Sequence, residues 1–470
     1  MKKTKIICSI GPSCNDAKVL SEMAIHGMNA ARINFSHGTY ADKDKMVENI
    51  LEARKLAKKE IAILWDTRGP EFRTGSFKND AAKLETDGIV KIVKGDVLGD
   101  NSTISVNHDE ALKKINVGNT LLVDDGKIRL EVIGKHKDEL ECKILVGGVL
   151  TNNKSISVPG VDLDLPYVSK QDKKDIEYAC RNDGEFLAIS FVSSKDNVLE
   201  IRKILKEYNR EDLKIICKIE SKLGLENLDE ILEVCDGIMV ARGDLGTEMP
   251  SEKLPILQKQ IIKKARRAGK LAIVATEMLE SMLDEVRPKR SETSDIANAV
   301  LDGTDAVMLS AETAIGDYPV RTVSAMGRIC NVTEEYATFD YIDDDKALYD
   351  ETSAIAEAVV DTSNRLHAKL ICASTISGDT ACEISNLKPD AYILALCPNS
   401  KVRRKLALNW GVYTKVVPFY NSTDEVLIES VKSAKEFMGL QKDDILITTG
   451  SFPSTGESHP TNLMKIEKIK

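Results

Sequence analysis

The sequence is poor in aromatic residues and has no long hydrophobic run. Phe, Trp and Tyr make up 5% of the 470 residues, and they do not alternate with basic residues as in proteins that stack on nucleic-acid bases. No apolar stretch reaches the roughly 20 residues that a membrane-spanning helix needs. The net charge of −9 at pH 7 disfavours binding to nucleic acid or to an anionic membrane surface. We therefore expect neither partner.

Cysteine and histidine are also sparse and scattered. The ten cysteines form no CxxC pair, most stand singly inside apolar runs, and the six histidines form no cluster. Such spacing argues against a disulfide framework and against a zinc site. The first residues lead directly into a strand-like run, without the apolar segment of a signal peptide. These features predict a cytoplasmic protein.

The length of the chain predicts two or three domains, because a single core stops growing near roughly 250–300 residues. Short β-branched runs alternate with amphipathic helical patterns, and they cover residues 5–10, 31–35, 61–66, 186–191, 214–220, 237–242, 271–276 and 305–310. Nearly continuous apolar strands, separated by helices such as 43–59, 252–268 and 292–301, are typical of a (β/α)8 TIM barrel. An open doubly wound sheet is the competing fold, although it usually has fewer strands.

Two parts of the chain depart from the barrel pattern. About 120 residues separate the third and fourth strand-like runs, far more than a βα loop needs. Residues 70–166 are rich in Gly, Asp, Asn, Thr and Val with short alternating runs, which predicts an inserted small all-β lid domain. A second pattern of strands and helices predicts a C-terminal open α/β domain over 341–470, after an acidic linker at 343–345. The barrel would then comprise residues 1–69 and 167–340.

Charged residues follow most of the predicted barrel strands. In this fold the active site forms at the carboxyl ends of the strands, so these residues should converge. Arg32, Arg73, Lys218 and Arg242 are cations that would face one basin. Such a basin favours a polyanionic substrate.

Two carboxylates, Glu220 and Asp244, end neighbouring predicted strands. Hard oxygen ligands suit Mg²⁺ or Mn²⁺, which takes the rest of its shell from water and substrate. The pair could instead act as a general acid and a general base. Surrounding cations would lower the pKa of both carboxylates and keep them ionised, which favours the metal. Gly243 beside them would let the backbone approach a ligand closely.

Long stretches of the sequence, taken in order, resemble the pyruvate kinase family over essentially the whole chain. They are TKIICSIGPS, ARINFSHG, WDTRGPEFRTG, IICKIES, IMVARGDLGTE, VATEMLESM, RPKRSETSDIANAVLDGTDAVMLSAET and GDYPV. The resemblance implies the same three-domain layout, a homotetramer and allosteric control, often by a sugar phosphate or a nucleotide. It also implies phosphoryl transfer from phosphoenolpyruvate to ADP, giving pyruvate and ATP, with dependence on Mg²⁺ (or Mn²⁺) and K⁺.

The family pattern assigns the residues of phosphoryl transfer. It places Lys218 at the transferring phosphoryl group and the enolate oxygen, with Arg32 gripping the same group. Glu220 and Asp244 would hold the divalent metal. Because a loose transition state spreads charge over oxygens, a fixed ammonium and a metal would do most of the work.

Further assignments follow from the same resemblance. Thr276 and the backbone at Gly243 and Asp244 would seat the substrate carboxylate and the metal. The residues bordering the nucleotide would be Asn34, His37 and Arg73. The oxygen cage for K⁺ would be formed by Asn34, Ser36, Asp66 and Thr67. In the family, Glu at the position of Glu71 accompanies a K⁺ requirement, whereas Lys there replaces the ion. The alternative is that Glu71 only pairs with Arg68 or Arg73. The proton donor to the enolate is left open, with a water near Thr276 and Glu312 as one candidate.

Several positions depart from the family pattern. Ser193 and Ser194 stand where the family usually has Arg–Lys, of which the Lys contributes to binding nucleotide phosphates. Lys195 lies one residue further on and could reach a similar point on its flexible stem. Arg68 and Glu277 replace a usual Lys and a usual Gln.

A hydroxyl-rich segment in the C-terminal part follows a strand and opens a helix. The candidate residues for a phosphorylated effector, which the family binds here, are Ser374, Thr375, Ser377 and Thr380. The alternative is a helix N-cap by Ser377 or Asp379. Asp379 would repel an anion, and Cys382 stands where an Arg is common, so the effector stays unidentified.

Two other classes of function remain open at this point. A barrel lyase acting on a pyruvate-like enolate with Mg²⁺ would use the same strand ends, but it would need no lid and no nucleotide site. A non-catalytic metabolite sensor could keep the fold. The presence of Lys218, Glu220, Asp244 and Thr276 argues against such a sensor.

Overall fold

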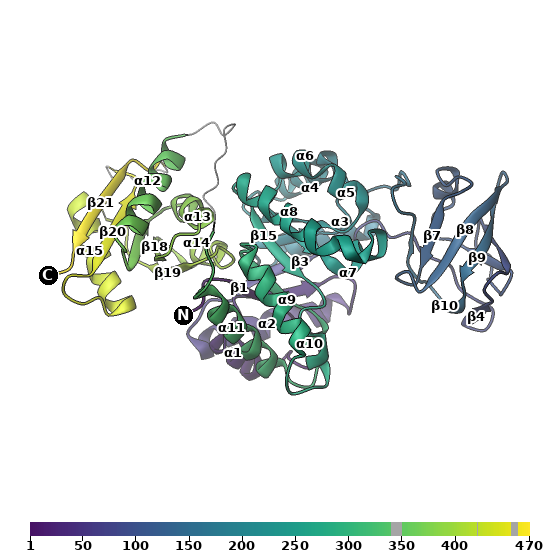
Figure 1. Cartoon of the computed structure of the whole chain (residues 1–470), viewed down its shortest axis with the longest axis horizontal. Coiled ribbons are helices and arrows are strands. Elements are labelled where there is room, and N and C mark those ends of the chain that lie inside the picture. Colours follow the sequence, from purple (N-terminus) through teal and green to yellow (C-terminus); the bar gives the residue numbers. More distant parts are fainter. Residues whose placement is uncertain (340–349, 421, 453–458) are drawn as a thin grey trace.

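The computed structural model describes residues 1–339, 350–420, 422–452 and 459–470. Figure 1 shows three parts in a row: a β domain at one end, a barrel surrounded by helices in the middle, and an α/β domain at the other end. The predicted boundary at residue 340 and the acidic stretch 343–345 lie outside the described residues. The limits of the three domains stay predictions.

The central part is a closed barrel of parallel strands in the order β1-β16-β15-β14-β13-β12-β3-β2. The strands are β1 (Lys5–Ser9), β2 (Ala30–Asn34), β3 (Ala62–Asp66), β12 (Phe186–Ile189), β13 (Lys214–Ile219), β14 (Gly237–Ala241), β15 (Leu271–Ala275) and β16 (Ala306–Leu309). Every residue of β1, β3, β14 and β15 is buried, which explains their continuous apolar runs in the sequence. The predicted (β/α)8 barrel is confirmed, because β1 pairs with both β2 and β16 and so closes the sheet.

Helices cover the outside of the barrel and pack their apolar faces against the strands. They are α1 (Ala17–Ile25), α2 (Tyr40–Ala57), α3 (Lys170–Arg181), α4 (Lys195–Glu207), α5 (Lys222–Glu226), α6 (Leu228–Val234), α7 (Arg242–Glu248), α8 (Leu254–Arg267), α9 (Arg290–Leu301), α10 (Ala311–Ala314) and α11 (Pro319–Glu334). Thr39 before α2 and Ser169 before α3 start their helices with reciprocal side-chain caps. None of the helices in the described residues combines the length and apolar composition that a bilayer crossing requires.

The inserted segment forms a lid with two small sheets around its own core. One sheet has the strand order β11-β7-β8-β9-β5-β6, and the other pairs β10 with β4. The strands are β4 (Ala81–Leu84), β5 (Ile89–Val93), β6 (Thr103–Ser105), β7 (Thr120–Val123), β8 (Ile128–Lys135), β9 (Glu139–Val146), β10 (Gly148–Thr151) and β11 (Ile156–Ser157). Leu130, Leu140 and Cys142 alternate with more exposed neighbours along β8 and β9, as a one-sided sheet requires.

The C-terminal part is a sheet in the order β19-β18-β17-β20-β21 with helices packed on it, which confirms the predicted α/β domain. Its strands are β17 (Leu370–Ser374), β18 (Tyr392–Cys397), β19 (Val412–Val416), β20 (Ile445–Gly450) and β21 (Leu463–Lys468). Its helices are α12 (Glu351–Arg365), α13 (Asp379–Asn386), α14 (Ser400–Lys405) and α15 (Thr423–Met438). The antiparallel edge strand β21 was not predicted, because Lys465, Glu467 and Lys468 interrupt any apolar run.

The two ends of the barrel face different neighbours. The carboxyl ends of the strands, here called the rim, lie toward the lid, and the amino ends, the floor, lie against the C-terminal domain (Figure 1). Leu408, between α14 and β19, is fully buried in the cluster inside the barrel with Ile7 and Phe186. Lys388 forms a buried ion pair with Asp305 at the same end. The rim is thus supported from below by a packed floor.

Candidate active site

A pocket of 580 Å³ lies between the rim and the lid. Its walls come from the ends of β2, β3, β12 and β13, from α7 and from lid strand β11. The predicted site residues that line it are Arg32, Asn34, Ser36, Asp66, Thr67, Arg73, Lys218, Glu220 and Asp244. They meet because parallel neighbouring strands end at the same edge of the barrel.

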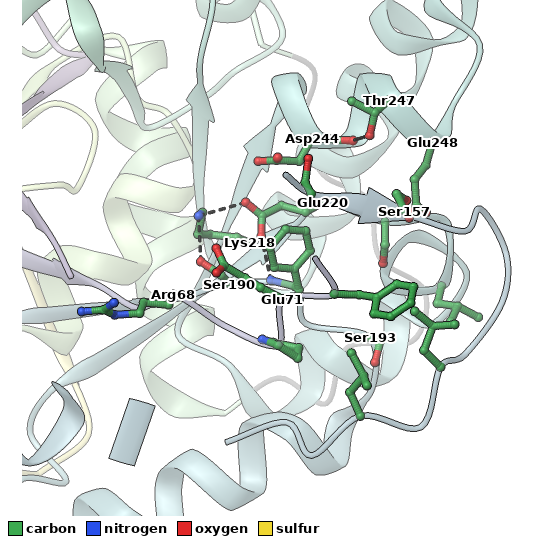
Figure 2. Close-up of a pocket in the computed structure, with 18 of the residues that line it drawn as sticks. Arg68, Glu71, Ser157, Ser190, Ser193, Lys218, Glu220, Asp244, Thr247 and Glu248 are labelled. Atoms are coloured by element: carbon green, nitrogen blue, oxygen red, sulfur yellow. Dashed lines mark hydrogen bonds and ion pairs between the residues drawn. The ribbon is translucent and has the colours of Figure 1, made fainter. Parts of the chain in front are cut away.

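Lys218 is the centre of a polar network at the end of β13 (Figure 2). Its ammonium donates to Ser190 Oγ at 2.8 Å and forms ion pairs with Glu220 at 2.9 Å and Asp66 at 3.4 Å. Burial alone would lower the pKa of Lys218, but Asp66 and Glu220 outweigh it and raise that pKa above its ordinary value. The pocket therefore contains a permanent cation at a fixed point.

Arg32 supplies a second fixed cation. Its Nε donates to Asp66 Oδ2 at 2.6 Å, and its Nη1 donates to Ser9 Oγ at 2.9 Å. Burial alone would raise the pKa of Asp66, but Arg32 and Lys218 hold it below its usual range. Arg32 and Lys218 share Asp66, and Lys218 also pairs with Glu220, so both cations are held at fixed points of the pocket.

Glu220 and Asp244 come together beside Lys218 (Figure 2). Glu220 Oε2 accepts a hydrogen bond from the backbone N–H of Phe191 at 2.6 Å. Desolvation, with the charge of nearby Glu220, raises the pKa of Asp244 to about 7. The expectation that cations keep both pKa values low is therefore wrong for Asp244. The reason is that Lys218 pairs with Glu220 and Asp66, whereas no cation in the described residues forms an ion pair with Asp244.

Two crowded carboxylates fit a divalent cation, which would relieve their repulsion. Their oxygens are hard ligands of the type that Mg²⁺ and Mn²⁺ prefer. Within the described ranges, no group of three or more His, Cys, Asp or Glu side chains is placed to hold a metal. A metal at Glu220 and Asp244 would therefore take its other ligands from water and substrate.

The four oxygen-bearing residues of the expected K⁺ cage lie at or just after the ends of β2 and β3. Asn34 Oδ1 accepts from the N–H of Ser36 at 2.9 Å, and Thr67 Oγ1 accepts from the N–H of Ser190 at 3.1 Å. Together with Asp66 they offer amide, hydroxyl and carboxylate oxygens on one side of the pocket. This donor set suits a hard monovalent cation.

Three other predicted residues lie beside the pocket and are not among those that line it: Gly243, Thr276 and His37. The backbone N–H of Gly243 donates to Thr276 Oγ1 at 2.8 Å, so these two are neighbours. Thr276 has φ of 68° and Glu277 has φ of 53°, a left-handed conformation that is unfavourable for a β-branched residue. Backbone strain of this kind is typical of functional sites. The carbonyl of His37 accepts from Lys43 Nζ at 2.8 Å.

The prediction that Arg242 faces the basin is wrong. Its guanidinium pairs with Asp295 of α9 at 2.5 Å and donates to the carbonyl oxygens of Thr276 at 2.6 Å and Glu277 at 3.1 Å. The carboxylate of Asp295 and the backbone carbonyls of Thr276 and Glu277 thus draw the guanidinium of Arg242 away from the pocket. Arg242 thereby holds the turn that carries Thr276.

The sequence left open whether Lys195 takes the place of the lysine missing at Ser194, and the structure does not place Lys195 in the pocket. Lys195 pairs with Glu233 at 2.6 Å on the surface and does not line the pocket, whereas Ser193 and Ser194 do. Both carboxylate oxygens of Glu312 accept backbone N–H groups, from Leu279 and Ser310.

Two functional-site residues were missed in the sequence. Ser190, which contacts Lys218, follows β12 directly. Its hydroxyl at the carboxyl end of a barrel strand could have identified it as a residue of the site. Glu248 at the end of α7 accepts from Ser157 of the lid at 2.5 Å. No local pattern indicates that contact, because its partner is 91 residues away in the chain.

The candidate effector residues come together in a separate pocket of 440 Å³ in the C-terminal domain. Asp350, Asp379 and Glu383 also line it, and no Lys or Arg is among its described lining residues. Desolvation, with the charges of Asp350 and Asp379, raises the pKa of Glu383. The N-cap position of α13 is Gly378, and Ser377 Oγ accepts the N–H of Asp379, the first residue of that helix, at 3.4 Å.

A closed (β/α)8 barrel that gathers fixed cations and a carboxylate pair under a lid defines a barrel enzyme for an anionic substrate. The chain matches the description "Pyruvate kinase, barrel domain" over residues 1–323 and "Pyruvate kinase, alpha/beta domain" over residues 353–467. The chain belongs to the pyruvate kinase family.

Individual relatives agree with this assignment. A pyruvate kinase of Clostridium perfringens is 42% identical and covers 100% of both chains. One of Geobacillus stearothermophilus is also 42% identical, over 100% of this chain and 80% of the relative. A crystal structure of a pyruvate kinase from Cryptosporidium parvum has a TM-score of 0.94 at 36% identity, covering 100% of this chain and 96% of the other.

Proposed function

We propose that the chain transfers the phosphoryl group of phosphoenolpyruvate to ADP, giving pyruvate and ATP. The observation that carries the proposal is the position of Lys218, fixed by Ser190, Glu220 and Asp66 in the middle of the rim pocket. Membership of the pyruvate kinase family supports the same reaction.

The cations would act on the transferring group. Lys218 would lie at the phosphoryl group and at the enolate oxygen, where negative charge is redistributed during transfer. Arg32 would grip the phosphoryl oxygens with the guanidinium edge that Asp66 and Ser9 leave open. Both side chains are held before substrate arrives, so little reorganisation is needed at the moment of reaction.

Glu220 and Asp244 would hold Mg²⁺ or Mn²⁺, and Asn34, Ser36, Asp66 and Thr67 would hold K⁺. When bound, these ions supply positive charge that neutralises phosphoryl and carboxylate oxygens. Because the pKa of Asp244 is raised to about 7, Asp244 would release a proton when the divalent ion binds.

The remaining roles concern the two ends of the substrates. Thr276 and the backbone at Gly243 and Asp244 would seat the carboxylate of phosphoenolpyruvate, with the strained turn fixed by Arg242. The nucleotide would be bordered by Asn34, His37 and Arg73.

We also propose a homotetramer in the cytoplasm, as the glycolytic role of the family suggests. A phosphorylated effector at Ser374, Thr375, Ser377 and Thr380 stays a prediction, and the carboxylates of that pocket argue against it.

The test is a coupled assay of pyruvate formation from phosphoenolpyruvate with Mg²⁺ and K⁺, with and without ADP. Phosphoryl transfer requires pyruvate formation that depends on ADP and yields ATP in equal amount. Pyruvate formed equally well without ADP would indicate a lyase or a phosphatase. No turnover under either condition would indicate a metabolite sensor.

A further inference from the structure

Ser190 connects two parts of the active-site pocket. It directly follows β12 and is 2% exposed. Its Oγ accepts a hydrogen bond from the ammonium of Lys218 at 2.8 Å (Figure 2). The same Oγ donates to the backbone carbonyl of Thr67 at 2.8 Å, and the backbone N–H of Ser190 donates to Thr67 Oγ1 at 3.1 Å. One buried residue therefore contacts both the cation of the proposed reaction and a proposed ligand of K⁺.

The directions of these hydrogen bonds follow from the groups involved. A hydroxyl has one proton and two lone pairs, whereas an ammonium can only donate. The proton of Ser190 Oγ therefore points to Thr67, and a lone pair points to Lys218. Because each hydrogen bond in such a chain polarises the next, a displacement of Thr67 alters the contact between Ser190 and Lys218.

Ser190 differs from the carboxylate partners of Lys218 in having no charge. Lys218 also pairs with Asp66 and Glu220, and both carboxylates are proposed ligands of bound ions. A carboxylate that shares its charge with a metal ion attracts an ammonium less strongly. Ser190 Oγ belongs to neither proposed ligand set, so its contact with Lys218 keeps its strength when the ions are in place.

The next residue, Phe191, extends this arrangement to the proposed divalent site. Its N–H donates to Glu220 Oε2 at 2.6 Å. Its φ of 54° is left-handed, which is unfavourable for an aromatic residue and persists only where surrounding contacts hold the backbone. The turn after β12 thus holds Lys218 through Ser190 and Glu220 through Phe191.

The two chain segments that join the lid to the barrel both reach Ser190. In the segment that enters the lid, Gly69 has φ of 78°, and a Cβ added to it would lie 2.9 Å from Ser190 Cβ. In the segment that leaves the lid, the hydroxyl of Tyr167 donates to the backbone carbonyl of Ser190 at 3.0 Å. Burial raises the pKa of Tyr167, so this hydroxyl keeps its proton. A movement of the lid that displaces either segment therefore acts on Ser190.

We propose that Ser190 is a positioning residue for the transfer reaction and that Tyr167 connects it to the lid. Ser190 acts through its neighbours, because it holds Lys218 at the reacting group and Thr67 in the K⁺ cage. The hydrogen bond from Tyr167 supports both contacts by fixing the carbonyl of Ser190. The inference rests on the proposed phosphoryl transfer and adds a physical link between the lid, the K⁺ cage and Lys218.

The experiment compares five full-length proteins: the wild type, Ser190→Ala, Tyr167→Phe and two controls, Ser385→Ala and Tyr178→Phe. Ser385 is matched to Ser190, because it is 1% exposed and donates to a backbone carbonyl at 2.7 Å, but it lies in the C-terminal domain. Tyr178 is matched to Tyr167, because its hydroxyl also donates a hydrogen bond, to Asp44 on α2. Neither control residue lines the active-site pocket.

The first measurement is steady-state kinetics with varied phosphoenolpyruvate, ADP and K⁺. Ser190→Ala should lower kcat about tenfold or more, as loss of a hydrogen bond to a charged group does, with the KM for phosphoenolpyruvate within about threefold. Tyr167→Phe should lower kcat about threefold, and both variants should raise the K⁺ concentration for half-maximal activity. Unchanged kcat and K⁺ dependence in both variants overturns the proposal, and so do equal losses in the matched controls. Tyr167→Phe keeps the test decisive if Ser190→Ala does not fold.

The second measurement needs no turnover. Thallium(I), a substitute for K⁺, is titrated calorimetrically into each protein in potassium-free buffer. Ser190→Ala and Tyr167→Phe should each weaken thallium(I) binding about threefold or more, while the two controls bind like the wild type. Equal thallium(I) affinities in all five proteins overturn the proposed link to the K⁺ cage. If the wild type forms no pyruvate from phosphoenolpyruvate and ADP, the proposed function fails, whereas the thallium(I) affinities still decide whether Ser190 and Tyr167 hold the cage.

Discussion

The guanidinium of Arg73 holds the carboxylate of Glu71 through two hydrogen bonds, from Nε at 2.8 Å and from Nη2 at 2.7 Å. Its third nitrogen donates to the carbonyl of Asn153 in the lid at 2.7 Å. Both members of the pair line the active-site pocket. Glu71 therefore adds no uncompensated anion to the pocket, and Arg73 adds no free cation. The cations that contact the proposed K⁺ cage are Arg32 and Lys218, and both do so through Asp66.

The first prediction concerns the pair of Glu71 and Arg73, whose charges cancel each other. We expect activity to depend strongly on K⁺, because the anionic substrate needs a cation near Asn34, Ser36, Asp66 and Thr67. Glu71→Lys should relieve the dependence, since it supplies an ammonium and also frees Arg73. Glu71→Gln is the control that frees Arg73 without adding a charge. Initial rates are measured in potassium-free buffer with a large inert organic cation, where full wild-type activity would contradict the prediction.

The second prediction concerns Lys218. We expect Lys218→Met to abolish turnover while phosphoenolpyruvate binding stays within about tenfold, because the ammonium acts mainly on charge that develops in the transition state. Direct binding and single-turnover rates distinguish the two effects. The role is wrong if binding is lost while the maximal rate is unchanged.

The third prediction concerns the carboxylate pair. Asp244→Asn and Glu220→Gln should each raise the Mg²⁺ concentration needed for half-maximal activity steeply, because each removes one of two anions from the metal. Glu220→Gln should also lower the maximal rate, since Glu220 is an ion-pair partner of Lys218. Titration of activity with Mg²⁺ at fixed substrate tests this. Wild-type titration curves for both variants are incompatible with the metal assignment.

The fourth prediction concerns the nucleotide side. Ser194 lines the pocket, whereas Lys195 is paired with Glu233 outside it. Ser194→Lys should tighten apparent ADP affinity modestly through a new charge-assisted contact to phosphate. Lys195→Met is the matched control and should leave ADP affinity unchanged. Weaker ADP binding in the control would show that Lys195 reaches the nucleotide after all.

The sequence predicted the barrel because its strands are buried on both faces and therefore appear as continuous apolar runs, as β3 and β15 do. It also predicted which charged residues meet at the rim, since parallel strands end together. It did not predict side-chain direction. Arg242 directly follows a barrel strand, but Asp295 and two backbone carbonyls draw its side chain away from the pocket. The raised pKa of Asp244 was missed for a similar reason, because Lys218 is shared among other carboxylates.

The last prediction concerns closure of the lid. Ser157 Oγ in lid strand β11 donates to Glu248 Oε1 at 2.5 Å, and the backbone N–H of Lys222 donates to Glu248 Oε2 at 2.8 Å. Glu248 belongs to α7, the helix that carries Asp244 in its first turn, and it thus joins the lid to α7 and to the start of α5. A hydrogen bond to a carboxylate contributes about 1.5–3 kcal/mol. Loss of the hydrogen bond between Ser157 and Glu248 should shift the lid toward more open positions, in which the pocket is not closed.

We expect Ser157→Ala to lower kcat/KM for ADP by about tenfold, which corresponds to roughly 1.4 kcal/mol. Ser102→Ala is the control, because Ser102 Oγ donates to Asp100 within the lid itself and Ser102 does not line the pocket. Glu248→Ala should lower kcat/KM at least as far, since it removes the contact to Lys222 as well. The double variant should then be no worse than Glu248→Ala, because the two residues act through one hydrogen bond. Additive losses in steady-state kinetics would mean that Ser157 and Glu248 act independently and that their contact does not hold the lid.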